Sequence, residues 1–186
     1  MGGERDDDPG FIGAHLREHG YQIEASYREG HPAWPALDGI DLLLLLGSDW
    51  SLYWEHLDAH TAEEAALVQA ASRAGVPTFG ICYGAQMIAH ALGGSVRRAE
   101  VAEVGWFEID SDLPEHIEPG PWMEWHYDVL TVPPAATELA RSPLAPQAFV
   151  LGRTFGVQFH PEVDRTIVAG WASSGGDAEL TRMGID

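Results

Sequence analysis

The chain has 186 residues, of which 45% are hydrophobic and 21% charged, a composition typical of one globular domain with an apolar core. Its formal net charge of -19, with ten basic residues, argues against a nucleic-acid partner, because phosphate binding needs clustered basic side chains. No apolar run approaches the roughly 18 residues that cross a bilayer, and Met1 to Asp8 lacks the basic-then-apolar order of a secretory signal. We therefore expect a cytoplasmic protein that does not enter the membrane.

The first half of the chain predicts strands that alternate with helices. We expect a helix over 10–19, a strand over 21–27, a buried strand over 40–46, a helix over 61–73, a buried strand over 76–81 and a helix over 83–92. For the helix over 61–73, Thr61 is the expected N-cap, Glu63 and Glu64 suit the first turn, and Gly75 ends it. This alternation is typical of a parallel sheet covered on both faces.

The second half predicts mostly strands and turns. We expect strands over 104–109, 125–132, 147–151 and 154–159, a last helix over 164–173, and a loosely ordered glycine-rich tail over 174–186. All 186 residues are predicted to form one domain. A right-handed crossover needs a strand before the first helix, so we also expect that the usual first strand lies upstream of Met1.

The only cysteine, Cys82, lies between two glycines, Gly80 and Gly84, where a predicted strand meets a helix. This spacing is that of a nucleophile elbow, in which a sharp turn exposes the reactive side chain at the carboxyl end of the sheet. The positive end of the following helix favours the reactive thiolate. A single cysteine is more often a small buried apolar residue, so its partners have to decide between the two interpretations.

A base and an orienting acid follow the last predicted strand, as His160 and Glu162. Residues two apart in an extended chain point the same way, so Glu162 can lie beside His160, and Pro161 favours that extended backbone. A thiol, an imidazole and a carboxylate are the three groups that nucleophilic acyl transfer needs.

Backbone N–H groups are the predicted oxyanion hole. Tyr83 follows the nucleophile directly, and Gly47 and Ser48 follow the leucine-rich strand. Gly47 is equally consistent with an ordinary turn glycine. His56 and His60 have the spacing of a helical metal pair, but no third ligand is evident, so we expect neither a metal nor a cofactor.

Taken together, these segments resemble the class I, triad-type glutamine amidotransferases, and in particular the glutaminase part of GMP synthase. The resemblance covers about 41–163 and is carried by residues 80–86 (GICYGAQ), 93–94 (GG), 125–128 (WHYD) and 156–162 (GVQFHPE). It implies a flavodoxin-like three-layer α/β sandwich with a mostly parallel central sheet and extra antiparallel strands. It also implies L-glutamine as nitrogen donor, the triad Cys82, His160 and Glu162, and glutamine contacts from Gln86, Trp125 and His126.

The sequence departs from that family at the loop after the leucine-rich strand, which commonly reads Gly-Gly-Pro and here continues from Gly47 with Ser48, Asp49 and Trp50. Three functions stay open. The first is a glutaminase that delivers ammonia to a separate synthetase. The second is a hydrolase of other γ-glutamyl amides or peptides on the same scaffold. The third is a catalytically silent regulatory module, which the complete set of three catalytic residues disfavours.

Overall fold

The computed structural model describes residues 8–29 and 34–184, which form two compact units. The first unit comprises Ala25–His160, and the second comprises Asp8–Glu24 with the chain from Pro161 onward. The elements are α1 (Gly10–Glu18), β1 (Leu43–Leu45), η1 (Glu55–Leu57), α2 (Asp58–Ala74), β2 (Thr78–Ile81), α3 (Tyr83–Ala91), β3 (Ser95–Phe107), β4 (Asp110–Ser111), β5 (Trp122–Thr131), β6 (Thr137–Arg141), β7 (Pro146–Leu151), β8 (Thr154–Val157), α4 (Arg165–Trp171), η2 (Ala172–Gly176) and α5 (Asp177–Met183). Among the described residues, no helix is both long enough and apolar enough to cross a membrane.

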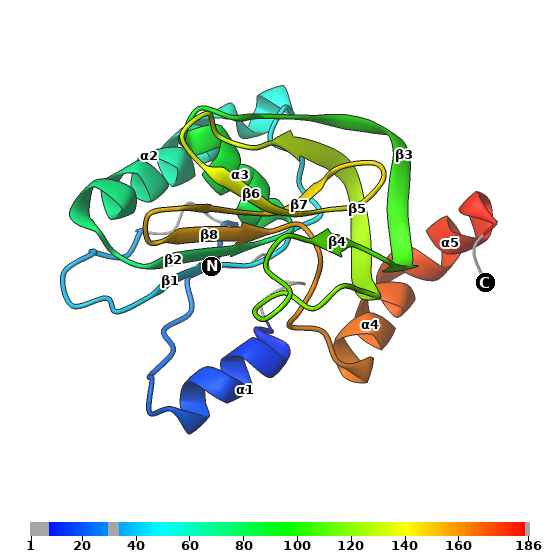
Figure 1. Ribbon diagram of the computed structural model, residues 1–186, viewed down its shortest axis with the longest axis horizontal. Helices are drawn as coiled ribbons and strands as arrows, with labels where there is room; N and C mark the ends of the chain where they lie inside the picture. Colours follow the sequence, from blue (N-terminus) through cyan, green and yellow to red (C-terminus); the bar gives the residue numbers. More distant parts are fainter. Residues whose placement is uncertain (1–7, 30–33, 185–186) are drawn as a thin grey trace. The chain divides into compact units, whose positions relative to one another are not determined.

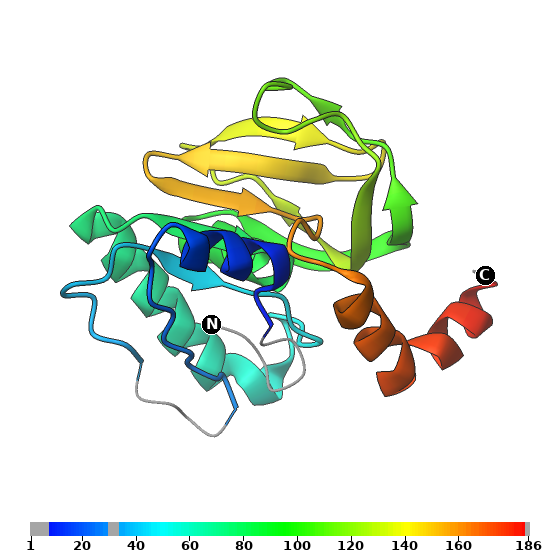
Figure 2. The same ribbon diagram turned by 90° about the horizontal axis from the view of Figure 1, so that it is seen from below.

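The first unit is built on a six-stranded sheet with the order β1-β2-β8-β7-β6-β4 (Figures 1 and 2). Strands β1, β2 and β8 are parallel neighbours, whereas β7, β6 and β4 continue the sheet with antiparallel pairing. β8 lies beside β2 although more than seventy residues of chain separate them, and Gly80 is in register with Gly156. The three parallel strands therefore end at the same edge of the sheet.

Helix α3 contacts all three parallel strands, and α2 packs against α3. The core between them contains Leu45, Val68, Met87 and Phe149, all at most 1% exposed. Burial of apolar side chains of this size stabilises the fold by about 2 kcal/mol each, which fixes the position of α3 on the sheet. Gly75 ends α2 in the left-handed conformation, as the sequence predicts.

A long antiparallel ribbon of β3 and β5 forms a second, two-stranded sheet (Figure 1). Its register shifts between Arg98 and Glu103, after which Glu103 pairs with His126. Both strands contact α3, and β5 also contacts β7. The ribbon thus brings the side chains of β5 next to the helix that follows Cys82.

The second unit consists of helices. Asp164 caps α4, because its carboxylate accepts hydrogen bonds from the N–H groups of Thr166 (2.7 Å) and Ile167 (3.0 Å). α1 is joined to the chain after β8 by a hydrogen bond from the Phe11 N–H to the Glu162 carbonyl, at 2.8 Å. α4 and α5 are separated by the kinked segment η2, in which Gly175 has a φ of 116°.

Several expectations from the sequence need correction. Residues 21–27 form no strand: only Tyr27 makes an isolated bridge, and Tyr21 and Ile23 are exposed. α2 begins at Asp58 rather than at Thr61, which is buried within the helix and is not its cap. β4 and β6 lie in a stretch for which we predicted no strand. The tail, for which we expected little order, contains α5.

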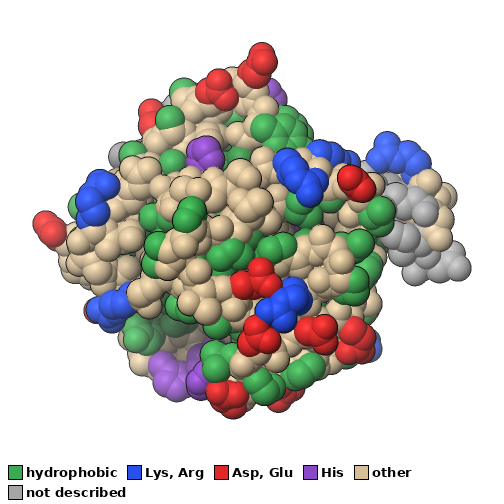
Figure 3. Space-filling model, turned by 45° about the horizontal axis from the view of Figure 1, so that its top comes forward, with side chains coloured by type: hydrophobic (Ala, Val, Ile, Leu, Met, Phe, Trp, Pro, Cys, Tyr) green, Lys and Arg blue, Asp and Glu red, His purple; other side chains and the backbone are tan. Residues whose placement is uncertain are grey.

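Acidic and basic side chains are interspersed on the face drawn in Figure 3, with apolar groups between them. On this face, within the described part of the chain, the basic side chains do not gather into an extended patch. Arg141, for example, is paired with Asp112 and with Glu138.

Candidate functional site

Three predicted site residues follow the carboxyl ends of three neighbouring strands. Gly47 comes after β1, Cys82 directly after β2, and His160 after β8. Because these strands are parallel and adjacent in the order β1-β2-β8, their carboxyl ends meet at one edge of the sheet. This edge is where open α/β sheets bind their ligands.

Cys82 has the backbone conformation of a nucleophile elbow. Its φ of 51° and ψ of -110° make it the one non-glycine residue in the described chain with a positive φ. L-residues avoid this region, so its occupation by a cysteine is a strained conformation that the surrounding structure imposes. The Cys82 N–H donates to the Val157 carbonyl at 2.8 Å, which ties the turn to β8.

The two glycines around Cys82 are required by close backbone packing. A Cβ atom on Gly84 would lie 2.2 Å from the carbonyl oxygen of Leu45, and one on Gly80 would lie 2.6 Å from the backbone of Gly84. Contacts this short are not tolerated by backbone atoms. Glycine at both positions therefore lets α3 start immediately after β2 and hold the thiol at the edge of the sheet.

Gly47 lies beside both Cys82 and His160. A Cβ atom on Gly47 would lie 3.3 Å from Cε1 of His160 and 3.8 Å from Cβ of Cys82. The imidazole and the thiol-bearing carbon thus face the same glycine. Cys82 and His160 are 5% and 4% exposed, so both side chains are held inside the protein.

His160 and Glu162 belong to different compact units, since the first unit ends at His160. The His160 N–H donates to the carbonyl of Met123 in β5, at 2.8 Å. Glu162 is 3% exposed, and a Cβ atom on Gly10 would lie only 1.9 Å from its carbonyl oxygen. The pairing of His160 with Glu162 stays a prediction from their spacing in the chain.

The three residues predicted to contact glutamine lie close to Cys82 along α3 and β5. The Sγ atom of Cys82 is 3.9 Å from the backbone carbonyl oxygen of Trp125. Gln86 is 3% exposed, and its side-chain amide donates to Gln158 at 3.2 Å and to the Asp128 carbonyl at 3.4 Å. Gln86 is therefore engaged with the protein interior, and its role toward a substrate stays a prediction.

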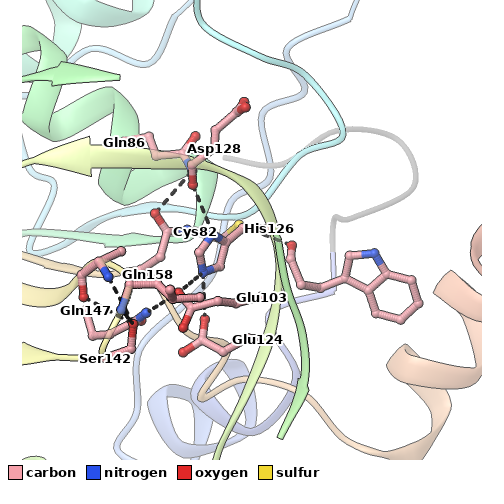
Figure 4. A network of polar contacts seen from close by, with 12 residues as sticks. Cys82, Gln86, Glu103, Glu124, His126, Asp128, Ser142, Gln147 and Gln158 are labelled. Carbon is pink, nitrogen blue, oxygen red and sulfur yellow. Dashed lines mark hydrogen bonds and ion pairs between the residues drawn. The ribbon is translucent and has the colours of Figure 1, made fainter. Parts of the chain in front are cut away.

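His126 lies in a cluster of polar side chains (Figure 4) and is itself buried. Its Nδ1–H donates to the Asp128 carbonyl at 2.9 Å, and its Nε2 is 3.2 Å from a carboxylate oxygen of both Glu103 and Glu124. Gln147 donates a further hydrogen bond to Glu103, at 3.0 Å. All four of these side chains are at most 3% exposed.

The cluster keeps His126 charged. Burial lowers the pKa of His126, but the hydrogen bonds and charges of Glu103 and Glu124 outweigh burial and raise that pKa to about 10. Burial raises the pKa of Glu124 above its ordinary value, against the lowering effect of His126. Sequence patterns do not indicate this cluster, because Glu103 and Glu124 lie on two strands whose pairing has to be known first.

Asp128 connects β5 to the loop after β1. Its carboxylate accepts hydrogen bonds from the hydroxyl groups of Ser51 (2.5 Å) and Tyr53 (2.6 Å). Partial burial and the hydrogen bond to Asp128 raise the pKa of Tyr53. Asp128 is recognisable in the sequence as part of the segment 125–128, but its partners Ser51 and Tyr53 are too distant along the chain for any local pattern to connect them with it.

Comparison with known proteins gives a consistent result. Residues 55–168 match the family model "Glutamine amidotransferase class-I". The chain is 38% identical to GMP synthase [glutamine-hydrolyzing] of Aeropyrum pernix over 138 residues, which are 66% of this chain and 26% of that protein. It is 42% identical to the protein of the same name from Acetivibrio thermocellus over 101 residues, 50% of this chain and 20% of that one. The chain thus spans between about a fifth and a quarter of the length of these relatives.

Solved structures show the same fold. A glutamine amidotransferase from Thermotoga maritima has a TM-score of 0.89 and 27% identity, covering 100% of this chain and 84% of that one. One from Methylobacillus flagellatus has a TM-score of 0.85 and 27% identity, covering 94% and 73%. The predicted flavodoxin-like α/β class, with parallel strands and extra antiparallel strands, is confirmed.

Proposed function

The chain belongs to the glutamine amidotransferase class-I family, and from that premise we propose that it hydrolyses the side-chain amide of L-glutamine through a thioester on Cys82. The observation that carries the proposal is the meeting of Gly47, Cys82 and His160 at the ends of three adjacent parallel strands. A strained nucleophile elbow beside an imidazole is the arrangement that acyl transfer uses.

In the first half-reaction, the Cys82 thiolate attacks the side-chain amide carbon of glutamine and a carbon–sulfur bond forms. The carbonyl oxygen becomes an oxyanion. When this intermediate collapses, the carbon–nitrogen bond breaks, and His160 gives its proton to the leaving nitrogen so that ammonia departs. The N-terminus of α3 directly follows Cys82, and its dipole favours the negative sulfur.

In the second half-reaction, His160 takes a proton from water, and the resulting hydroxide attacks the γ-glutamyl thioester. The carbon–sulfur bond breaks, which releases glutamate and restores the Cys82 thiolate. Both steps pass through an oxyanion, for which the N–H groups of Tyr83 and of Gly47 or Ser48 are the proposed donors. Glu162, two residues after His160, is the proposed group that orients the imidazole.

The relatives support a proposal for the fate of the ammonia. GMP synthases hydrolyse glutamine by name, and this chain matches about a quarter of their length. We propose that the ammonia is passed to a synthetase on a separate chain. A protein of Thermoplasma acidophilum whose name describes it as one part of a GMP synthase has a similar fold, with a TM-score of 0.65.

Release of ammonia from glutamine by the purified protein tests the proposal. Wild type is expected to release ammonia and glutamate in equal amounts, and Cys82→Ala to release neither while unfolding at the same temperature. Mass spectrometry of the glutamine-treated protein should find the γ-glutamyl adduct on Cys82. Faster turnover of γ-glutamyl amines or peptides than of glutamine would instead favour the second function, a hydrolase, and absence of turnover with every γ-glutamyl compound would favour a silent module.

A further inference from the structure

Arg28 is a buried arginine that contacts the loop after β1. It is 1% exposed, and its Nη2 and Nη1 groups donate to the carbonyl oxygens of Leu46 (3.0 Å) and Gly47 (3.1 Å). Its Nε group is 3.1 Å from both carboxylate oxygens of Glu64 in α2. Arg28 precedes the residues that match the family model, which begin at 55.

These two carbonyls determine where two N–H groups point. A peptide unit is planar, with its C=O and N–H directed to opposite sides. Fixing the Leu46 carbonyl therefore fixes the N–H of Gly47, and fixing the Gly47 carbonyl fixes the N–H of Ser48. The N–H groups of Gly47 and Ser48 are the candidate oxyanion donors on this loop, so one guanidinium orients both.

The guanidinium also contacts the ring of Tyr83. Its carbon lies 4.5 Å from the centre of the Tyr83 ring, and the N–H of Tyr83 is the remaining candidate donor. Burial lowers the pKa of Arg28, but Glu64 and Tyr83 outweigh it, so the pKa lies above its already high ordinary value and the group stays charged. A fixed positive charge behind a carbonyl polarises that peptide and makes its N–H a stronger donor.

We propose that Arg28 is a positioning residue, which orients the candidate oxyanion donors Gly47 and Ser48 in the loop after β1 by binding the carbonyl groups of that loop. Glu64 holds the guanidinium in place. This role rests on the function proposed above. The planar fork of arginine suits the task, because it reaches two successive carbonyls and a carboxylate at once, whereas a lysine ammonium cannot hold that geometry.

The alternative is a purely structural role, in which Arg28 only stabilises the fold through its buried ion pair with Glu64. Two variants distinguish this role from the positioning of the loop. Arg28→Met leaves the Glu64 charge buried and unpaired, which can unfold the protein. The double variant Arg28→Met/Glu64→Met removes both charges, and replacing a buried ion pair by apolar residues of similar size is often neutral for stability. Arg73→Met, at an exposed position in the last turn of α2, is the matched control.

Each protein is assayed for kcat and KM on glutamine, for thermal unfolding, and for the rate at which iodoacetamide alkylates Cys82. Alkylation displaces iodide at a saturated carbon and develops no oxyanion, so it reports the thiolate alone. We expect the double variant to unfold near the wild-type temperature, to be alkylated at the wild-type rate, and to lose about 10- to 100-fold in kcat with KM changed little, because its oxyanion donors are misplaced.

A double variant that folds and keeps the kcat of wild type and of Arg73→Met overturns the positioning role while glutamine hydrolysis stands. A fall in the alkylation rate as large as the fall in kcat also overturns it, because the defect then lies in the thiolate. A wild-type protein that releases no ammonia from glutamine, and no amine from other γ-glutamyl amides, overturns the proposed function and this role with it.

Discussion

Gly47→Ala places a methyl group between the proposed nucleophile and base. The added carbon would lie 3.3 Å from Cε1 of His160 and 3.8 Å from Cβ of Cys82. Since carbon atoms pack best at about 3.5–4.0 Å, the contact with Cys82 is ordinary, and the imidazole has to move by a few tenths of an ångström. Displacement of a catalytic group by about 1 Å can lower a rate about 100-fold, so this smaller shift should lower kcat about tenfold.

The stability of the same variant should change by about 1 kcal/mol or less, because only one side chain is displaced. We would measure ammonia release at saturating glutamine and urea unfolding on the same preparation. Gly170→Ala is the control: apart from its chain neighbours and the backbone of its own helix, no atom lies within 4 Å of the added carbon. Alanine also favours the α4 helix, so kcat should be unchanged. A Gly47→Ala protein with wild-type kcat and stability would refute the closeness of imidazole and thiol.

Three further results are expected. Gly84→Ala should destabilise the fold by about 4 kcal/mol or more in thermal unfolding, because its Cβ would lie 2.2 Å from the Leu45 carbonyl oxygen, and a normal melting temperature would contradict that packing. Asp128→Ala should lower the free energy of unfolding in urea by about 3 kcal/mol, since two hydroxyl groups lose a charged acceptor, and Asp128→Asn, which keeps one acceptor oxygen, should lose about half as much. The pKa of His126 is raised from 6.5 to about 10 in the folded protein. The charged imidazole therefore stabilises the fold fully below pH 6.5, and this stabilisation is lost as the pH rises toward 10. Unfolding free energies should fall over that range by a few kcal/mol, and less steeply in Glu103→Gln; an equal slope in both proteins would contradict the charged cluster.

Local patterns were sufficient to predict most of the parallel part of the sheet. Local sequence is enough to indicate two features: the buried strands β1 and β2, from their apolar runs, and the turns at the end of α2 and around Cys82, from their glycines. The strand predicted over 21–27 is wrong for a physical reason. The alternating apolar side chains resemble a strand, but Tyr21 and Ile23 are exposed, and only Tyr27 of this segment makes a bridge. β6 was missed because its polar sequence is ordered by pairing with β7.

The candidate site was predictable only where its chemistry is carried by adjacent residues. Cys82 and His160 were identified from short motifs, and the structure brings both to Gly47. Arg28 could not have been found in this way, because a lone arginine outside any motif has no pattern. Its contacts with Glu64 and with the carbonyl groups after β1 form only in the folded chain. The same holds for Glu103, whose partner His126 is set by the register of β3 and β5.

The position of β8 between β2 and β7 has a consequence for biosynthesis. A chain that emerges from the ribosome contains Cys82 long before the residues of β8 have been made, and proteins tend to fold from the end that emerges first. Cys82 and His160 can therefore come together only after β8, which pairs non-locally with β2, has joined the sheet. Under the proposed function, nascent and truncated chains would be unable to hydrolyse glutamine, so that activity would appear only when the fold is complete.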